Sequence, residues 1–286
     1  MQAGAPGGDT MDTEVKISVI MGVYNARPEQ LLQAVESIRL QGLQEWEMIL
    51  YDDGSSPACA QRIRDAASLD GRIRCIRGVE NRGLAHALNQ CIRHARGPFL
   101  ARMDADDVAA PDRLEKQYTF LQAHPQYQWV GSNALLMDEN GIWGLQKMPA
   151  APQAKDFLPH SPYIHPSVLF RREALTQNGG YCEDRRYLLC EDYELFMRLH
   201  RNGGRGYNLQ EPLLQYREDA SAYRRRTLAR RLREMRLRHH GFQALSILNA
   251  ATFPYVLKPL LAGAAPAALQ RWLRRNSGAV ALQKER

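Results

Sequence analysis

From Val15 onward, short apolar runs alternate with amphipathic stretches, which predicts alternating β-strands and α-helices. The predicted strands are 16–23, 46–51, 72–77 and 99–103, and the predicted helices are 28–41, 58–69 and 84–95. This order predicts parallel strands joined by right-handed crossovers. Ligands of such open sheets bind beyond the carboxyl ends of the strands.

In the second half of the chain the alternation becomes less regular. The turn sequence Asp138-Glu139-Asn140-Gly141 follows an apolar run and indicates antiparallel strands. The remaining predicted elements are a helix over 112–124, strands over 128–137, 165–171 and 207–216, and a helix over 191–202. The expected fold class is therefore α/β, with a mixed sheet flanked by helices.

The charge is unevenly distributed along the chain. The 286 residues carry 38 Lys+Arg and 31 Asp+Glu, a formal net charge of +7. Residues 217–286 alone carry +11, whereas residues 1–216 carry −4. With 44% hydrophobic and 24% charged residues, collagen-like, low-complexity and disordered classes are excluded. The basic character belongs to the C-terminal region.

The N-terminus and the cysteines bear on domain limits and compartment. Residues 1–14 lack the basic start and apolar run of a secretory signal, and their composition predicts a flexible leader.

Five scattered cysteines without a Cys-x-x-Cys pair indicate reduced thiols in a cytoplasmic protein. We expect three parts: the leader 1–14, an α/β domain over 15–218 and a basic helical region over 219–286.

Polar residues follow the predicted strands. These segments are Val23-Tyr24-Asn25, Asp52-Asp53, Asn81-Arg82 and Asp104-Ala105-Asp106. Residues two apart in an extended segment point to the same side, so Asp104 and Asp106 would repel unless a cation lies between them. Oxygen ligands suit Mg²⁺ or Mn²⁺, which usually bridge to substrate phosphates. Asp52 and Asp53 can accept hydrogen bonds from a base or ribose, and Tyr24 offers a ring for stacking.

Each of these features also has a purely structural interpretation. Asp-Gly and Asn-Arg-Gly are common turn sequences, and Asp106 or Asp107 would cap the next helix. Tyr24 would be a core or surface tyrosine without a binding role. No Gly-x-Gly-x-x-Gly motif and no P-loop is present, so a bound nucleotide would need a metal to neutralise its phosphates.

Glu191-Asp192 opens the predicted helix over 191–202. Acidic residues at a helix N-terminus stabilise the helix dipole, which is the structural interpretation. The functional interpretation is a general base, since an ionised carboxylate at a rigid helix start can accept a proton from an attacking hydroxyl. Spacing alone does not choose between the two.

Six ordered motifs make residues 16–217 resemble the inverting family-2 glycosyltransferases of GT-A fold. The motifs are 18–25 (SVIMGVYN), 52–55 (DDGS), 81–85 (NRGLA), 104–107 (DADD), 165–172 (HPSVLFRR) and 191–195 (EDYEL). Each motif alone is weak, whereas all six in this order are specific. The resemblance implies that 15–218 is a GT-A glycosyltransferase domain.

The resemblance also implies roles for individual residues. Donor-binding residues would be Val23, Tyr24, Asn25, Asp52, Asp53, Asn81, Arg82 and Asp104, with Tyr24 and the Asp52/Asp53 pair holding base and ribose. Asp104 and Asp106 would bind Mn²⁺ or Mg²⁺. Asp192, beside Glu191, would deprotonate an acceptor hydroxyl for attack with inversion at the anomeric carbon. Further candidate site residues are His165, Arg171 and Arg217.

Two departures from the family pattern affect the expected metal ligands and the number of sugars transferred. Many relatives have a His shortly after Tyr-Arg, whereas Tyr216-Arg217 is followed by Glu218-Asp219-Ala220, so a third protein ligand for the metal is in doubt. The Gln/Arg-x-x-Arg-Trp motif of processive members is missing, because Ala268 stands three residues before Arg271-Trp272. We therefore expect transfer of one sugar.

In the C-terminal region, many arginines and the helical spacing of Leu228, Leu232 and Met235 predict a basic amphipathic helix over 223–240. Three prolines interrupt the apolar stretch over 242–273, which is therefore no membrane span. One interpretation is an anchor on an anionic membrane surface, which would make the protein peripheral on the cytoplasmic face. The alternative is a helical hairpin packed on the catalytic domain or on a second copy of the chain. No nucleic-acid motif accompanies the arginines, so we expect no nucleic-acid partner.

The expected function is single-sugar transfer from a nucleotide-sugar to a sugar, glycolipid or polysaccharide acceptor, in cell-surface polysaccharide or glycolipid synthesis. One alternative is a sugar nucleotidyltransferase, which should show a glycine-rich basic loop after the first strand; residues 22–26 (GVYNA) do not form one. Another is a non-catalytic adaptor that binds membrane or nucleic acid. The presence of Asp104, Asp106 and Asp192 argues against it.

Overall fold

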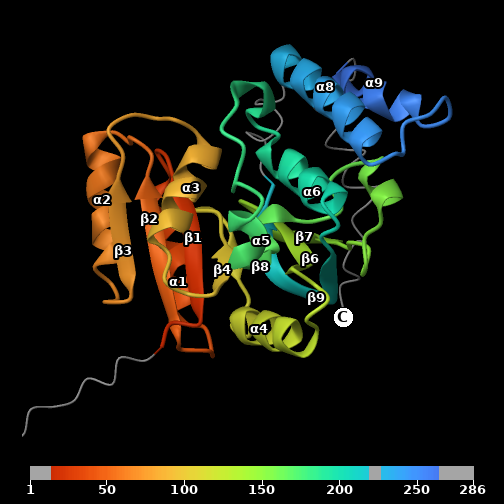
Figure 1. Cartoon of the computed structure of the whole chain (residues 1–286). Coiled ribbons are helices and arrows are strands. Elements are labelled where there is room, and N and C mark those ends of the chain that lie inside the picture. The colour runs from red at the N-terminus through yellow and green to blue at the C-terminus, as the bar shows by residue number, and fades with distance from the viewer. Residues whose placement is uncertain (1–13, 219–226, 264–286) are drawn as a thin grey trace, which may run out of the picture.

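The computed structural model describes residues 14–218 and 227–263, which form one mixed sheet with helices on both faces (Figure 1). The sheet has nine strands in the order β3-β2-β1-β4-β8-β6-β9-β5, with β7 paired to β6. Residues 1–13, 219–226 and 264–286 lie outside the described residues, and with them most of the predicted leader, the start of the helix predicted over 223–240 and the end of the apolar stretch over 242–273.

The N-terminal half is the predicted parallel arrangement. Its strands are β1 (Ile17–Val23), β2 (Trp46–Asp52), β3 (Ile73–Arg77) and β4 (Phe99–Arg102), and its helices are α1 (Pro28–Arg39), α2 (Pro57–Ala67) and α3 (Leu84–His94). All seven residues of β2 are buried, as expected for a strand covered on both faces. The register pairs Val23 with Asp52 and Asp52 with Arg77, so these strands end at one edge of the sheet.

The C-terminal half of the sheet is mostly antiparallel. Its elements are β5 (Val108–Ala109), α4 (Arg113–Ala123), β6 (Trp129–Asp138), β7 (Gly141–Gln146), the 3₁₀ turns η1 (Ala154–Phe157), η2 (His165–Ser167) and η3 (Arg185–Tyr187), β8 (Leu169–Arg171), α5 (Arg172–Thr176), α6 (Glu191–Arg201) and β9 (Gly206–Arg217). The predicted β6–β7 hairpin is confirmed. The strand predicted over 165–171 is wrong for its first residues, because Pro166 fits a 3₁₀ turn and lacks the N–H that a strand interior needs.

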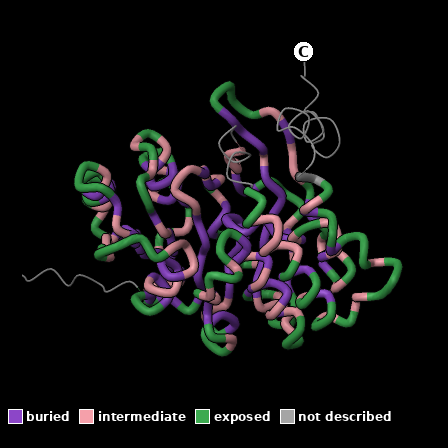
Figure 2. The backbone as a smooth tube through the Cα atoms, turned by 90° about the horizontal axis from the view of Figure 1, so that it is seen from above, coloured by how far each residue is buried: buried purple, intermediate pink, exposed green. Residues whose placement is uncertain are grey.

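Alternating side chains of the strands fill two separate apolar cores, one on each face of the sheet. Val19 and Met21 of β1 pack on the face that α1 covers, whereas Ile20 packs on the face that α3 covers. The buried strands run through the centre of the molecule and the exposed segments surround them (Figure 2). All five cysteines are free thiols.

The C-terminal helices α8 (Leu228–Ala244) and α9 (Phe253–Gly263) pack on each other, and α8 packs on α6. The predicted apolar face is wrong for Leu228, which is 66% exposed, whereas Leu232 is half-buried and Met235 packs against the core. The buried residues of α8 are Leu237, Arg238 and Phe242. Arg238 is buried because its guanidinium pairs with Glu234 at 2.9 Å and lies over the Tyr193 ring. Among the described residues, no helix has the length and apolar character required to cross a membrane.

Candidate functional site

The edge where β1 and β2 end is held together by short polar contacts. Asn25 adopts φ +47°, and its N–H donates to Ser55 Oγ at 3.0 Å while its Oδ1 accepts the N–H of Ser56 at 3.0 Å. Tyr24 is left 52% exposed at this edge, where its ring is free to stack. Val23 is buried, and its carbonyl accepts the N–H of Asp53 at 2.8 Å, so its contribution is to position its neighbours.

Asp52 and Asp53 are both buried and have different partners. Asp52 accepts the N–H of Ser55 at 2.8 Å, and its second oxygen lies 3.4 Å from Arg77 Nε. Asp53 accepts the N–H groups of Arg82 and Gly83, the latter at 2.8 Å. Asp53 therefore orders the loop that carries Arg82, a positional role that the sequence did not indicate.

The loop before α3 presents Asn81 and Arg82 to solvent. Arg82 reaches across to the second half of the chain, where its Nη2 lies 3.7 Å from Glu183 Oε2. The same Glu183 oxygen lies 2.9 Å from Nδ1 of the buried His86. Glu183 thereby connects the loop before α3 to the segment that leads into α6.

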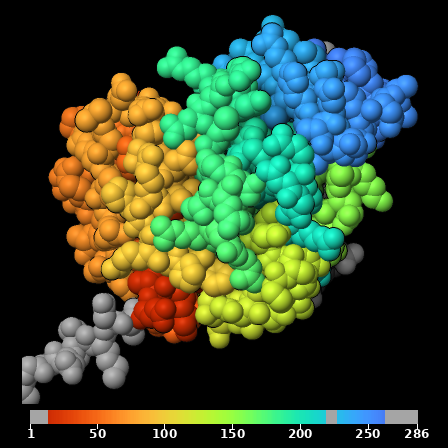
Figure 3. All heavy atoms as spheres, in the orientation of Figure 1, coloured from red at the N-terminus to blue at the C-terminus, as the bar shows by residue number. Residues whose placement is uncertain are grey.

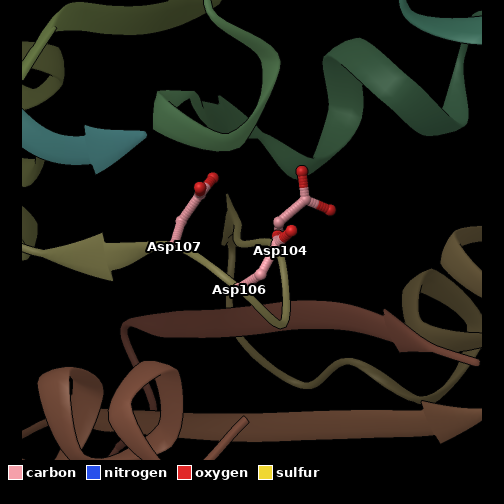
Figure 4. Close-up of side chains that lie close together, drawn as sticks. All are labelled: Asp104, Asp106 and Asp107. Carbon is pink, nitrogen blue, oxygen red and sulfur yellow. The ribbon is translucent and has the colours of Figure 1, made fainter. Parts of the chain in front are cut away.

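Three carboxylates gather after β4. Asp104, Asp106 and Asp107 place one oxygen each within 4.8 Å of one another, and Figure 4 shows their side chains pointing to the same side of the turn. The strand ends at Arg102, so a turn rather than an extended segment brings Asp104 and Asp106 together. Neither Asp106 nor Asp107 caps the next helix, because α4 begins at Arg113 after Asp112.

Asp107 is the member of this cluster that sequence reasoning missed. It is buried, its Oδ1 accepts the N–H of Arg217 at 2.8 Å, and its Oδ2 has no hydrogen-bond partner among the described residues. Burial, with the charges of Asp104 and Asp106, raises the pKa of Asp107 well above its ordinary value. An unpartnered buried oxygen beside two more carboxylates fits a divalent cation that prefers oxygen ligands.

Arg217 and Arg102 support the acidic cluster from two sides. Arg217, at the end of β9, also donates from Nε to the Asp106 carbonyl at 2.9 Å. Arg102 is 2% exposed, and its Nη1 lies 2.6 Å from Asp104 Oδ1. Arg102 was also missed, although an arginine within the predicted apolar strand 99–103 was a usable signal, because a buried charge requires a partner.

The residues of the motif 165–171 lie toward opposite ends of strand β4. His165 is buried, its Nε2 lies 2.7 Å from the Tyr181 hydroxyl, and burial with the charge of Arg102 lowers its pKa well below the ordinary value. Arg171 pairs with Phe99 at the opposite end of β4, where its guanidinium donates to the carbonyls of Tyr127 and Leu121. The structure therefore brings His165 toward the site and places Arg171 away from it.

Glu191 and Asp192 occupy the first turn of α6. Glu191 is 7% exposed, its Oε2 has no hydrogen-bond partner in the described part of the chain, and burial followed by the charge of Asp192 raises its pKa to about 7. Asp192 is partly exposed, and burial raises its pKa while the charges of Arg230 and Arg102 lower it. Of the two carboxylates, Asp192 is the more accessible to a substrate hydroxyl.

The raised pKa of Glu191 predicts a pH-dependent effect of Glu191→Gln on stability. Between the ordinary pKa near 4.5 and about 7, the folded state keeps a proton that the unfolded state loses, so this group destabilises the fold progressively as pH rises. Glutamine does not titrate. We expect the variant to gain stability relative to wild type up to pH 7, by about 1 to 3 kcal/mol, and then to level off.

Urea unfolding at pH 5, 6, 7 and 8 measures this difference. Glu173→Gln, an exposed glutamate on α5, is the control and should show no such trend. A constant difference between wild type and Glu191→Gln across the series would contradict the buried, proton-holding carboxyl.

The site therefore combines an acidic cluster after β4 with a carboxylate pair at the start of α6, on a mixed sheet flanked by helices. The model of the family "Glycosyl transferase family 2" matches residues 18–179, and the chain belongs to this family. The chain is 37% identical over 276 residues to the "Putative glycosyltransferase EpsE" of Bacillus subtilis, covering 96% of this chain and 98% of EpsE. It is 30% identical to the "Amylovoran biosynthesis glycosyltransferase AmsE" of Erwinia amylovora, covering 73% and 79% of the two chains.

Solved structures identify the fold as GT-A. A mannosyltransferase from Pyrobaculum calidifontis, in complex with GDP-Man and Mn²⁺, aligns with a TM-score of 0.60 at 20% identity over 93% of this chain and 81% of its own. S. aureus TarS 1–349, in complex with UDP-GlcNAc, aligns with a TM-score of 0.64 at 19% identity over 91% and 79%. The family match assigns the chain to the glycosyltransferases rather than to the sugar nucleotidyltransferases or to non-catalytic adaptors.

Proposed function

We propose that this glycosyltransferase is metal-dependent, inverts the anomeric centre and transfers one sugar from a nucleotide-sugar to an acceptor hydroxyl. The acidic cluster of Asp104, Asp106 and Asp107 is the observation that carries the proposal. Within residues 14–218 and 227–263 the Oδ2 atom of Asp107 has no hydrogen-bond partner, so it could serve as a ligand for a cation. Solved relatives of the same fold hold GDP-Man with Mn²⁺ or UDP-GlcNAc, which supports a nucleotide-sugar donor.

Asp192 is the group that starts the reaction. Its carboxylate accepts the proton of the acceptor hydroxyl, and the hydroxyl oxygen attacks the anomeric carbon on the face opposite the diphosphate. The bond between anomeric carbon and diphosphate oxygen breaks, and the nucleoside diphosphate leaves with the electron pair. Mn²⁺ or Mg²⁺ held by Asp104 and Asp106 would neutralise the negative charge of the leaving diphosphate.

The residues at the edge where β1 and β2 end would hold the rest of the nucleotide-sugar. Tyr24 is exposed for base stacking, and Arg82 is exposed beside the same edge. Buried Asp52 and Asp53 fix the turns that present both side chains. These roles account for the polar residues that follow β1, β2 and β3.

A screen for nucleotide release tests the proposal. Uridine, guanosine and thymidine diphosphate sugars are incubated with Mn²⁺ and candidate acceptors, and the anomeric configuration of the product is read by NMR. We expect release with one donor class, loss of release with EDTA, and inversion. Retention of configuration, or full activity in EDTA, would overturn the corresponding part of the proposal.

We also propose that the C-terminal region binds an anionic membrane surface. On α9 the side chains of Phe253, Tyr255, Leu257 and Leu261 are exposed, the last of them 69%. Exposed apolar side chains next to the basic α8 suit the boundary between headgroups and acyl chains. Such binding would make the enzyme peripheral on the cytoplasmic face and bring it close to lipid-linked acceptors.

Vesicle flotation measures this binding. We expect the double variant Leu257→Ser/Leu261→Ser to lose most of its binding to phosphatidylglycerol vesicles, because apolar area no longer enters the membrane. Ile142→Ser, which removes an exposed apolar side chain from β7, is the control. Equal flotation of all three proteins would refute the α9 contact.

A further inference from the structure

Helix α8 extends past the beginning of α6. The two helices run in the same direction, because Arg238 lies over the Tyr193 ring and a Cβ at Gly241 would collide with the Met197 sulfur. Arg230 is eight residues before Arg238, about 12 Å along a helix. Tyr193 is only two residues after the start of α6. The first turn of α8 therefore lies beyond the N-terminus of α6, on the side of the carboxylate pair.

The surroundings of this first turn agree with that placement. Arg233 donates from Nη1 to the carbonyl of Leu188 at 3.4 Å, in the segment that leads into α6. Burial raises the pKa of Asp192, and the nearby charge of Arg230 counteracts this rise. In Figure 1, α8 lies beside α6. Figure 3 shows green segments of the second half of the chain between the orange N-terminal half and the blue helices α8 and α9. The first turn of α8 therefore lies close to the segment before α6 and to Asp192.

The arginines of α8 fall into two groups. Arg231 donates to the Pro259 carbonyl at 2.9 Å and Arg238 donates from Nη1 to the Tyr255 carbonyl at 3.3 Å, so both hold α8 and α9 together. Within residues 14–218 and 227–263, no carboxylate lies within 4 Å of the guanidinium of Arg230 or Arg233. Both are only partly buried. They are therefore charged donors near the site whose charge is not used by an ion pair.

We propose that Arg230 and Arg233 form an anion subsite that binds a phosphate group of the acceptor. The inference rests on the proposed function, since it assumes that Asp192 activates the acceptor hydroxyl. A group that reaches Arg230 while its hydroxyl reaches Asp192 belongs to the acceptor, because the donor diphosphate lies toward the acidic cluster. Arginine forks one helical turn apart match the several oxygens of a phosphate or diphosphate.

The charge of the rest of the site explains why such a subsite is needed. Asp104, Asp106 and Asp192 repel an anionic acceptor when they are ionised. Glu234, the carboxylate on the same stretch of α8, is neutralised by Arg238. Arg230 and Arg233 therefore supply the positive charge that allows a phosphorylated acceptor to approach the base.

Matched acceptor pairs test the subsite. The probes are hexose and N-acetylhexosamine 1-phosphates, each compared with the methyl glycoside of the same sugar, with Mn²⁺ and the nucleoside diphosphate bound. Binding is followed by ligand-observed NMR. We expect wild type to bind the phosphate at least about tenfold more tightly than the glycoside. Arg230→Ala and Arg233→Ala should each remove most of that preference.

Arg236→Ala is the matched control, because it removes an equally charged, exposed side chain from the same helix. It should change the preference less than twofold, and no variant should change affinity for the nucleoside diphosphate. Phosphatidylglycerol vesicles form a second arm. If vesicles displace the sugar phosphate from wild type, the subsite takes a lipid phosphate; if they do not, it takes the phosphate of a soluble acceptor.

Three results would overturn the inference: equal binding of phosphate and glycoside, equal effects of Arg230→Ala and Arg236→Ala, or an Arg230→Ala defect that is the same for both acceptors. The last would make Arg230 only a positioning residue for Asp192. Absence of nucleotide release with every donor and acceptor would instead contradict the proposed function, so the two failures are distinguishable.

Discussion

Asp192→Asn is expected to abolish sugar transfer while leaving donor binding intact. Asparagine has the same shape, but its amide cannot accept the proton of the acceptor hydroxyl. Loss of a positioned general base typically costs about 10² to 10⁴ in rate. Transfer is measured as product formation with Mn²⁺, and donor affinity by calorimetry on the same preparations.

The pH profile gives a second measurement of the same group. Asp192 must be ionised to act, and burial raises its pKa above the ordinary 3.8. Transfer by wild type should therefore fall as pH decreases through that raised pKa. Asp65→Asn, the same change at an exposed position on α2, serves as the control. Transfer by Asp192→Asn at the wild-type rate would assign the base to another residue.

The first half of the fold was predictable because its signals are local. Pro28 and Pro57 each begin a helix, and the apolar runs of β1 and β2 are buried on both faces. Parallel strands also end together, so the position of Asp52 follows from the sequence pattern without long-range information. The edge at which these strands end could therefore be predicted before its contacts were known.

Residues whose role depends on contacts between distant segments were not predictable in the same way. Asp107 joins the acidic cluster because β9 returns beside β5 and supplies the N–H of Arg217. Arg171 is near His165 in sequence, but β8 runs antiparallel to β4 and carries it to the other end of the sheet. Motif membership alone does not distinguish these two outcomes.

In the structure, the arginines of the basic C-terminal region have different roles. From the sequence, its arginines suggest a membrane anchor or a hairpin packed on the domain, and the packed hairpin is present in residues 228–263. Arg238 contributes to that packing from a buried position. The charge of Arg230 instead opposes the rise that burial causes in the pKa of Asp192. A single run of arginines therefore combines packing, local electrostatics and surface charge.

Asp106→Ala is expected to remove the metal-dependent part of donor binding. The variant keeps the backbone carbonyl that Arg217 uses, so the turn should persist. One carboxylate fewer also relieves repulsion with Asp104 and Asp107, which should raise the melting temperature of the metal-free protein. Wild type should gain stability and at least about tenfold donor affinity with Mn²⁺, equivalent to about 1.4 kcal/mol, and the variant should gain neither.

Thermal unfolding and calorimetry with and without Mn²⁺ separate a lost metal site from a damaged fold. A variant that melts no lower than wild type without metal, yet does not respond to Mn²⁺, has lost the site and kept the fold. Asp112→Ala, at the N-terminus of α4, removes a nearby carboxylate outside the cluster and should respond like wild type. An unchanged Mn²⁺ response in Asp106→Ala would mean that Asp104 and Asp107 hold the metal without it.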